Sequence, residues 1–234
     1  MKILALDTAT ENCSAALWVD GSLVQREVEV PRGHADLILT MIDELLAQAA
    51  TALAGLDAIA FGRGPGSFTG VRLAASVTQG LAFGADLPVV PISDLRAVAQ
   101  RALNCMAEEN AAMRHILVCN DARMHEVYWA CFERSTDDVM TPVGTERVSK
   151  PADVHLPAEW SGTLVSAAGR GFAAYTELKE NLQSALTNIN EHILPGAGEI
   201  ASLAVAEVRA GRLLPPEEAV PVYLRDDVAR PKGS

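Results

Sequence analysis

The sequence predicts an α/β protein built from two related lobes, of which the second is reduced. Each half opens with an apolar strand that ends at an acidic residue, Asp7 or Asp121, and then turns back through a hairpin. The composition, 49% hydrophobic and 21% charged over 234 residues, is typical of a chain that forms a packed core. We expect lobes at residues 1–106 and 107–216, and a C-terminal segment at 217–234 that packs back on the first lobe.

Three strands are expected near the N-terminus, at residues 3–6, 14–19 and 23–30. The dipeptide Asp20-Gly21 between the second and third strands favours a tight hairpin turn. This order predicts an antiparallel meander.

A helix is predicted to begin near His34, where apolar residues recur at helical spacing. They cover an arc of roughly 200°, wider than the ~100° stripe that a surface helix needs. Two interpretations stay open: the arc is covered by the sheet and a neighbouring helix, or part of it contacts a partner protein. The apolar residues are Leu37, Ile38, Leu39, Met41, Ile42, Leu45, Leu46 and Ala49.

A strand at residues 57–62 and a helix at about 69–83 follow. One side of this helix suits packing on a sheet and carries Val71, Ala74, Ala75, Thr78, Leu81 and Ala82. The other side carries Arg72, Leu73, Ser76, Gln79, Gly80 and Phe83. Its small residues let another helix approach closely, whereas the apolar ones are poorly placed in water.

A short strand at 89–91 and a helix at 95–106 complete the first half. In the second half we expect strands and a final helix, at residues 115–120, 126–133, 139–148, 164–168 and 195–211. Residues 178–195 carry no assignable pattern.

The charge balance argues against a protein that grips nucleic acid unaided. The chain has 19 basic and 30 acidic residues, a formal net charge of −11. Neutralising phosphates requires clustered lysine and arginine, so any nucleic acid is expected to be contacted through a partner. No pair of the four cysteines has C-x-x-C spacing, and no apolar run approaches the roughly 18 residues that span a bilayer. We therefore expect a reduced, cytoplasmic protein without membrane contact.

The segment Gly62-Arg63-Gly64-Pro65-Gly66-Ser67 follows a strand and opens a helix, where free backbone N–H groups favour an anion. No lysine completes a P-loop, and Ser67 stands where a third glycine would complete a dinucleotide fingerprint. Two interpretations stay open, a rigid strand-to-helix corner or a phosphate-contacting loop. The candidate contacts are Gly64, Gly66 and Ser67.

Asp7, Thr8 and Thr10 form a second candidate phosphate site at the end of the first strand. A carboxylate beside hydroxyl donors can hold a hydrated Mg²⁺ and a phosphate chain. The alternative is that Asp and Thr cap the turn. No histidines stand at i and i+4, and Ser67 does not lie in a G-x-S-x-G elbow. We predict neither catalytic residues nor a metal site.

Several stretches resemble the TsaB (YeaZ) family, a bacterial component of the tRNA threonylcarbamoyladenosine (t6A) machinery. They are LALDTAT at 4–10, FGRGPGSFTGVR at 61–72, QGLAF at 79–83, DARM at 121–124 with EVY at 126–128, and PVYLRD at 221–226. The resemblance implies two lobes of the actin, sugar-kinase and Hsp70 type (ASKHA, ribonuclease H-like). The hairpin at 7–10 would then correspond to the first phosphate loop of that fold.

The resemblance also implies a non-catalytic partner of the related subunit TsaD, with which the ATPase TsaE associates. TsaD transfers threonylcarbamoyl from threonylcarbamoyl-AMP to N6 of the adenosine beside the anticodon. Its first helix carries an H-x-x-x-H metal motif; this chain has His34 there but Ile38 in place of the second histidine, so metal and transfer chemistry are not carried over. An ADP or ATP shared with partner subunits is the only cofactor expected.

Taken together, the two helices are predicted to dock TsaD, and to mediate homodimer formation when the chain is alone. The predicted interface comprises His34, Ile38, Met41, Ile42, Leu45, Arg72, Leu73, Ser76, Gln79, Gly80 and Phe83. The alternative function is an autonomous small-molecule kinase or ATPase of the same fold. A glycoprotease-like metallopeptidase is a further alternative, which the missing histidine disfavours.

Overall fold

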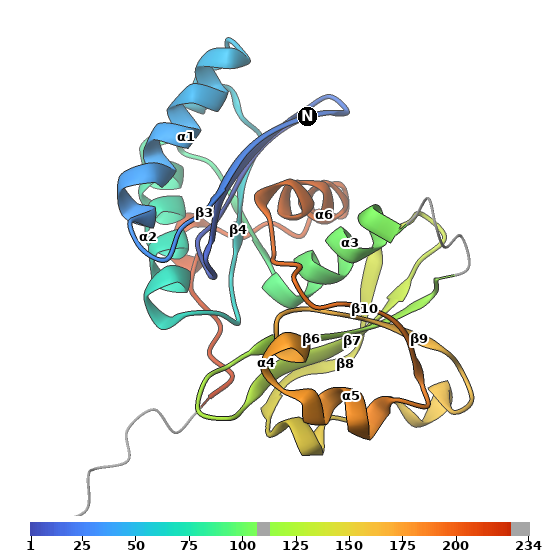
Figure 1. The fold of residues 1–234 in the computed structure, drawn as a ribbon. Coiled ribbons are helices and arrows are strands. Elements are labelled where there is room, and N and C mark those ends of the chain that lie inside the picture. The colour runs from blue at the N-terminus through green and yellow to red at the C-terminus, as the bar shows by residue number, and fades with distance from the viewer. Residues whose placement is uncertain (107–112, 226–234) are drawn as a thin grey trace, which may run out of the picture.

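The computed structural model describes residues 1–106 and 113–225 (Figure 1). Its first sheet has the order β3-β2-β1-β4-β5. The first three strands form an antiparallel meander, and β4 and β5 continue the sheet parallel to β1. The strands are β1 (Lys2–Asp7), β2 (Asn12–Val19), β3 (Ser22–Glu29), β4 (Ala58–Gly62) and β5 (Val89–Ile92).

The second sheet repeats this plan. Read from its meander, the order is β8-β7-β6-β9-β10, with β9 parallel to β6 and β10 parallel to β9. The strands are β6 (His115–Asp121), β7 (Val127–Arg134), β8 (Met140–Ser149), β9 (Val165–Ala168) and β10 (Leu186–Asn190). The matching order confirms the two related lobes expected from the sequence.

The helices show why the second lobe is the reduced one. The first lobe has α1 (His34–Gln48) between β3 and β4, and α2 (Phe68–Ala85) between β4 and β5. At the first of these places the second lobe has only short 3₁₀ turns, and at the other it has the short helices α4 (Gly171–Ala174) and α5 (Thr176–Leu182). After the fifth strand of each lobe come α3 (Asp94–Met106) and α6 (Ala197–Arg209).

Each of these last two helices packs on the sheet of the other lobe. Val98 of α3 belongs to a core cluster with Phe132 of the second sheet. Ile200 of α6 belongs to a cluster with Ile3 and Val90 of the first sheet. The division at 106/107 is therefore corrected: α6 covers the first sheet, α3 covers the second, and the two helices pack together (Figure 1).

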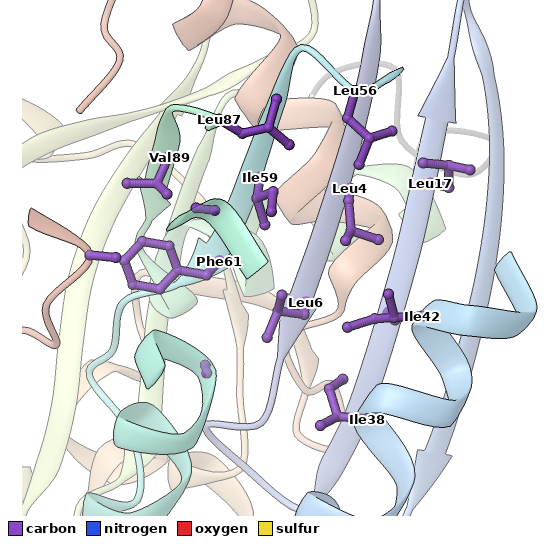
Figure 2. Close-up of a cluster of buried hydrophobic side chains, with 14 of the residues drawn as sticks. Leu4, Leu6, Leu17, Ile38, Ile42, Leu56, Ile59, Phe61, Leu87 and Val89 are labelled. Atoms are coloured by element: carbon purple, nitrogen blue, oxygen red, sulfur yellow. The ribbon is translucent and has the colours of Figure 1, made fainter. Parts of the chain in front are cut away.

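Helices α1 and α2 cover the opposite face of the first sheet from α6 (Figure 1). Ile38 and Ile42 point from α1 toward the strands that carry Leu4, Leu6 and Leu17 (Figure 2). Both isoleucines are at most 1% exposed. The centre of the wide apolar arc thus forms core, because helix and sheet each remove the other's apolar face from water.

The last described segment of the chain runs along the first lobe and ends against the second. Ala219 is buried in the core beneath α2, and the backbone N–H of Val222 donates to the carbonyl of Arg63 at 2.7 Å. Arg225 then reaches the second lobe, where its Nη2 donates to the carbonyl of Ala122 at 3.1 Å. Asp226, quoted above for the family resemblance, lies outside the described residues.

No helix within the described ranges is long and apolar enough to cross a membrane.

Candidate functional site

The two predicted phosphate loops are bonded to each other. The backbone N–H of Ser67 donates to the carbonyl of Ala9 at 2.7 Å. The hydroxyl of Thr8 donates to the carbonyl of Gly70 at 2.7 Å. Ser67 caps α2, with its Oγ accepting from the N–H of Gly70 at 3.1 Å. The hydrogen-bonding groups predicted for an anion are thus largely used within the protein.

Protein atoms fill the space beside the loop glycines. A Cβ on Gly66 would lie 2.7 Å from atoms of Ala9, and one on Gly64 would lie 2.9 Å from the carbonyl oxygen of Val222. Gly64 also has a φ of 101°, a left-handed conformation that favours glycine. This packing favours the first interpretation of the segment, a rigid strand-to-helix corner.

Asp7 is fully buried and faces Asp94, the first residue of α3. Burial raises the pKa of Asp7 to about 6. Burial, followed by the nearby charge of Asp7, raises the pKa of Asp94 well above its usual value. A hydrated Mg²⁺ needs an accessible carboxylate, and Asp7 has no exposed surface, so Asp7 does not fit that role. Asp94 was not among the predicted site residues. Its position just before the predicted helix at 95–106 was the only feature of the sequence that could have pointed to it.

Between the lobes lies a cleft of about 760 Å³. Thr8, Thr10, Gly66, Ser67 and His34 all line it, so the structure brings these predicted residues together. His34 is held in place because its Nε2–H donates to the carbonyl of Thr10 at 2.9 Å. The turn after β6 and the C-terminal segment at 222–225 also line the cleft.

Ion pairs tie the lobes together beside this cleft. Glu11, on the turn between β1 and β2, lies 3.6 Å from Arg123 and 3.4 Å from Arg170 of the second lobe. Arg170 also pairs with Glu29 at 2.6 Å. Together with the exchanged helices, these contacts hold the two lobes in one arrangement.

The predicted docking residues divide into two groups. Ile38, Ile42 and Leu45 are at most 1% exposed, which corrects the prediction that they contact a partner. Packing on the sheet uses them fully. The remainder lie at or near the surface: Arg72, Ser76, Gly80 and Phe83 are exposed, and His34, Met41, Leu73 and Gln79 are half-buried.

Large apolar side chains remain in water on these two neighbouring helices. Leu39 is 49% exposed on α1, and Phe83 is 59% exposed on α2. A Cβ on Gly80 or Gly84 would have no atom within 4 Å, so another helix can approach this part of α2 closely. Leu39 was missing from the predicted set, although it belongs to the same apolar arc. We call the exposed surface of α1 and α2 around Leu39, Gly80 and Phe83 the docking face.

Residues 1–106 and 113–225 were expected to contain no metal site, and the arrangement of their potential ligands is as follows. No group of three or more His, Cys, Asp or Glu side chains there could hold a metal ion. On α1, His34 lines the cleft, whereas Ile38 lies in the core. The two positions of the H-x-x-x-H motif therefore serve different purposes in this chain.

A duplicated five-stranded sheet, a cleft between the lobes and an exposed two-helix face define a two-lobed α/β protein of the actin, sugar-kinase and Hsp70 type. A family model described as TsaD, tRNA N6-adenosine threonylcarbamoyltransferase, matches residues 28–232. The chain belongs to the TsaB family, also called YeaZ.

Two relatives are named tRNA threonylcarbamoyladenosine biosynthesis protein TsaB. The protein of Escherichia coli is 41% identical over 98% of this chain and 96% of its own length. That of Haemophilus influenzae is 39% identical, over 97% and 95%. Among solved structures, YeaZ from Pseudomonas aeruginosa has a TM-score of 0.84 at 38% identity and covers 95% of this chain and 99% of its own.

Proposed function

We propose that this chain is a non-catalytic subunit in t6A biosynthesis, which binds TsaD and supports its transfer of threonylcarbamoyl to N6 of the tRNA adenosine beside the anticodon. The observation that carries the proposal is the docking face. Leu39 on α1 and Phe83 on α2 stay about half exposed, and Gly80 and Gly84 leave the surface of α2 open. Large apolar side chains that stay exposed on a folded protein are typical of an interface.

The same face is the proposed site of self-association when the chain is isolated. A helix pair with an apolar, small-residue surface can pack against a second copy of itself as well as against a related subunit. TsaE and tRNA are proposed to join the complex mainly through TsaD, which agrees with the net charge of −11. The work is proposed to take place in the cytoplasm.

No cofactor of its own is proposed. The loops that resemble phosphate loops bond to each other, and Asp7 is buried against Asp94. An ADP or ATP in this assembly would be shared with partner subunits across an interface.

The docking face is tested by placing charge on it. Leu39→Asp and Phe83→Asp put a carboxylate where apolar contact is proposed, and both positions are exposed enough to leave folding intact. Each variant should reduce the affinity for TsaD by roughly tenfold or more, and the double variant should abolish co-purification. Calorimetry with purified TsaD of the same organism gives the affinities.

The matched control is Leu164→Asp, because Leu164 is 65% exposed but lies immediately before β9 in the second lobe. It should bind TsaD like the unmodified chain. If the double variant folds and binds TsaD with unchanged affinity, TsaD does not dock on this face.

A further inference from the structure

An exposed guanidinium is held in place at the start of α2. The Cζ of Arg72 lies 3.7 Å from the centroid of the Phe68 ring and 5.6 Å from that of Tyr223. Its Nε donates a hydrogen bond of 2.7 Å to the Tyr223 hydroxyl. A side chain stacked and bonded in this way has lost much of its rotamer freedom before any partner arrives.

The rings that hold Arg72 are themselves fixed but open to solvent. Phe68 is 52% exposed at the first turn of α2, and Tyr223 is 45% exposed. Contacts on both sides of Tyr223 fix its position. The backbone of Val222 is bonded to Arg63, and Arg225 pairs with Glu126 of the second lobe. We call Phe68, Arg72 and Tyr223 the arginine cluster.

Arg72 has no acidic partner within the described ranges of the chain. Most other arginines do pair with acids, as Arg63 does with Glu146 at 3.0 Å and Arg101 with Glu27 at 2.7 Å. Arg72 is thus an ordered, exposed cation that stays unpaired in a chain of net charge −11. Its two terminal nitrogens remain available as a planar fork that fits a carboxylate or a phosphate.

The location of the cluster indicates what this fork binds. Arg72, Ser76, Gly80 and Phe83 are all exposed and follow one another along the same side of α2, so the cluster continues the docking face. Arginine and tyrosine are enriched among the residues that contribute most of the binding energy at protein interfaces. Glu217 and Glu218 lie on a 3₁₀ turn beside α2, where they would repel an RNA phosphate.

We propose that Arg72 anchors one end of the docking face by binding an aspartate or glutamate side chain of TsaD. This inference rests on the proposed function and adds the chemistry of one contact to it. Phe68 and Tyr223 orient the guanidinium and shield the ion pair from water, and the Tyr223 hydroxyl directs the remaining donors outward.

The test compares Arg72→Gln, Arg72→Lys and Tyr223→Phe in calorimetry with TsaD at low and high salt. Arg72→Gln should weaken binding by roughly tenfold to a hundredfold and flatten its salt dependence. Arg72→Lys should recover only part of this loss, because an ammonium cannot form the fork. Tyr223→Phe should weaken binding by roughly threefold to tenfold, since it removes only the bond that orients Arg72.

The matched control is Arg209→Gln, because Arg209 is exposed at the end of α6 and away from α2. It should leave the affinity unchanged. If Arg72→Gln binds TsaD normally while the Leu39→Asp, Phe83→Asp variant does not, the anchor is wrong and the docking face stands. If all of these variants bind normally, both proposals fail. If Arg72→Gln lowers only the affinity of the assembled complex for tRNA, the bound anion is an RNA phosphate and the inference is overturned.

Discussion

Asp7 and Asp94 face each other across Gly62, inside the molecule, where the first strand, the fourth strand and α3 meet. A Cβ on Gly62 would lie under 3.0 Å from the Oδ1 atoms of both carboxyl groups. The Ala9 N–H donates to Asp7 at 2.8 Å, and the Gly64 N–H donates to Asp94. Asp7 thus binds the hairpin loop at 7–10, and Asp94 binds the loop that leads into α2. Only glycine at position 62 leaves room for both carboxyl groups.

The pair predicts a definite pH dependence of stability. Burial raises the pKa of Asp7 to about 6, and burial together with Asp7 raises that of Asp94 well above its usual value. The folded state therefore holds protons that the unfolded state releases above about pH 4, so the free energy of unfolding falls as the pH rises from 4 through 6 and beyond.

Asp94→Asn should remove much of this loss, because an amide can still accept from Gly64 and can donate to Asp7. We expect a gain of about 1–2 kcal/mol at pH 8 and little gain at pH 4, measured by urea unfolding at both pH values. Asp43→Asn, at an exposed position of α1, should show no such difference. An equal effect of Asp94→Asn at both pH values would show that the raised pKa values of this pair do not cause the pH dependence.

Two glycines of α2 should respond in opposite ways to alanine. A Cβ on Gly70 would lie under 3.0 Å from the carbonyl oxygen of Thr8, whereas one on Gly80 meets nothing within 4 Å. Gly70→Ala should lower the free energy of unfolding by more than about 2 kcal/mol. Gly80→Ala should raise it by about 0.5–1 kcal/mol, because alanine is the better helix former. Thermal unfolding of the two variants measures both effects, and equal values would show that the corner is not tightly packed.

Self-association should depend on the docking face. The isolated chain is expected to form dimers at micromolar to millimolar concentration, and Phe83→Asp should shift it to monomer because the new carboxylates would repel each other across a symmetric contact. Sedimentation velocity over a concentration series measures the change. If Phe83→Asp remains dimeric to the same extent as the Leu164→Asp control, the dimer contact does not lie on the docking face.

The isolated chain should not act as a kinase or ATPase. The hairpin at 7–10 and the loop at 64–70 bond to each other, and Asp7 is fully buried where Mg-ATP cannot reach it. Calorimetry with Mg-ATP should show no micromolar binding, and no phosphate should be released. Micromolar affinity with turnover would favour the enzyme instead.

Local patterns in the sequence predicted most of the first lobe. The Asp20-Gly21 turn indicated the hairpin of β2 and β3, and helical spacing placed most of the buried side of α2 correctly. The same reasoning could not divide the apolar arc of α1. Ile38 and Leu39 are adjacent, equally apolar residues, and only the position of the sheet makes one core and the other surface.

Contacts between distant segments were beyond prediction. The exchange of α3 and α6 between the sheets depends on how the lobes meet, which no spacing along the chain records. The meeting of Asp7 with Asp94, and of Arg72 with Tyr223, likewise joins residues that are far apart in sequence. The short elements α4, α5 and β10 have too few residues to show a period.

The central claim is that this chain supports TsaD through the docking face. The most direct measurement is t6A formation on tRNA by purified TsaD and TsaE supplied with threonylcarbamoyl-AMP, with this chain, with its Leu39→Asp, Phe83→Asp double variant, or with neither. We predict modification with the unmodified chain and with the Leu164→Asp control, and none above background with the double variant or without the chain. Equal rates in all four reactions would contradict the claim.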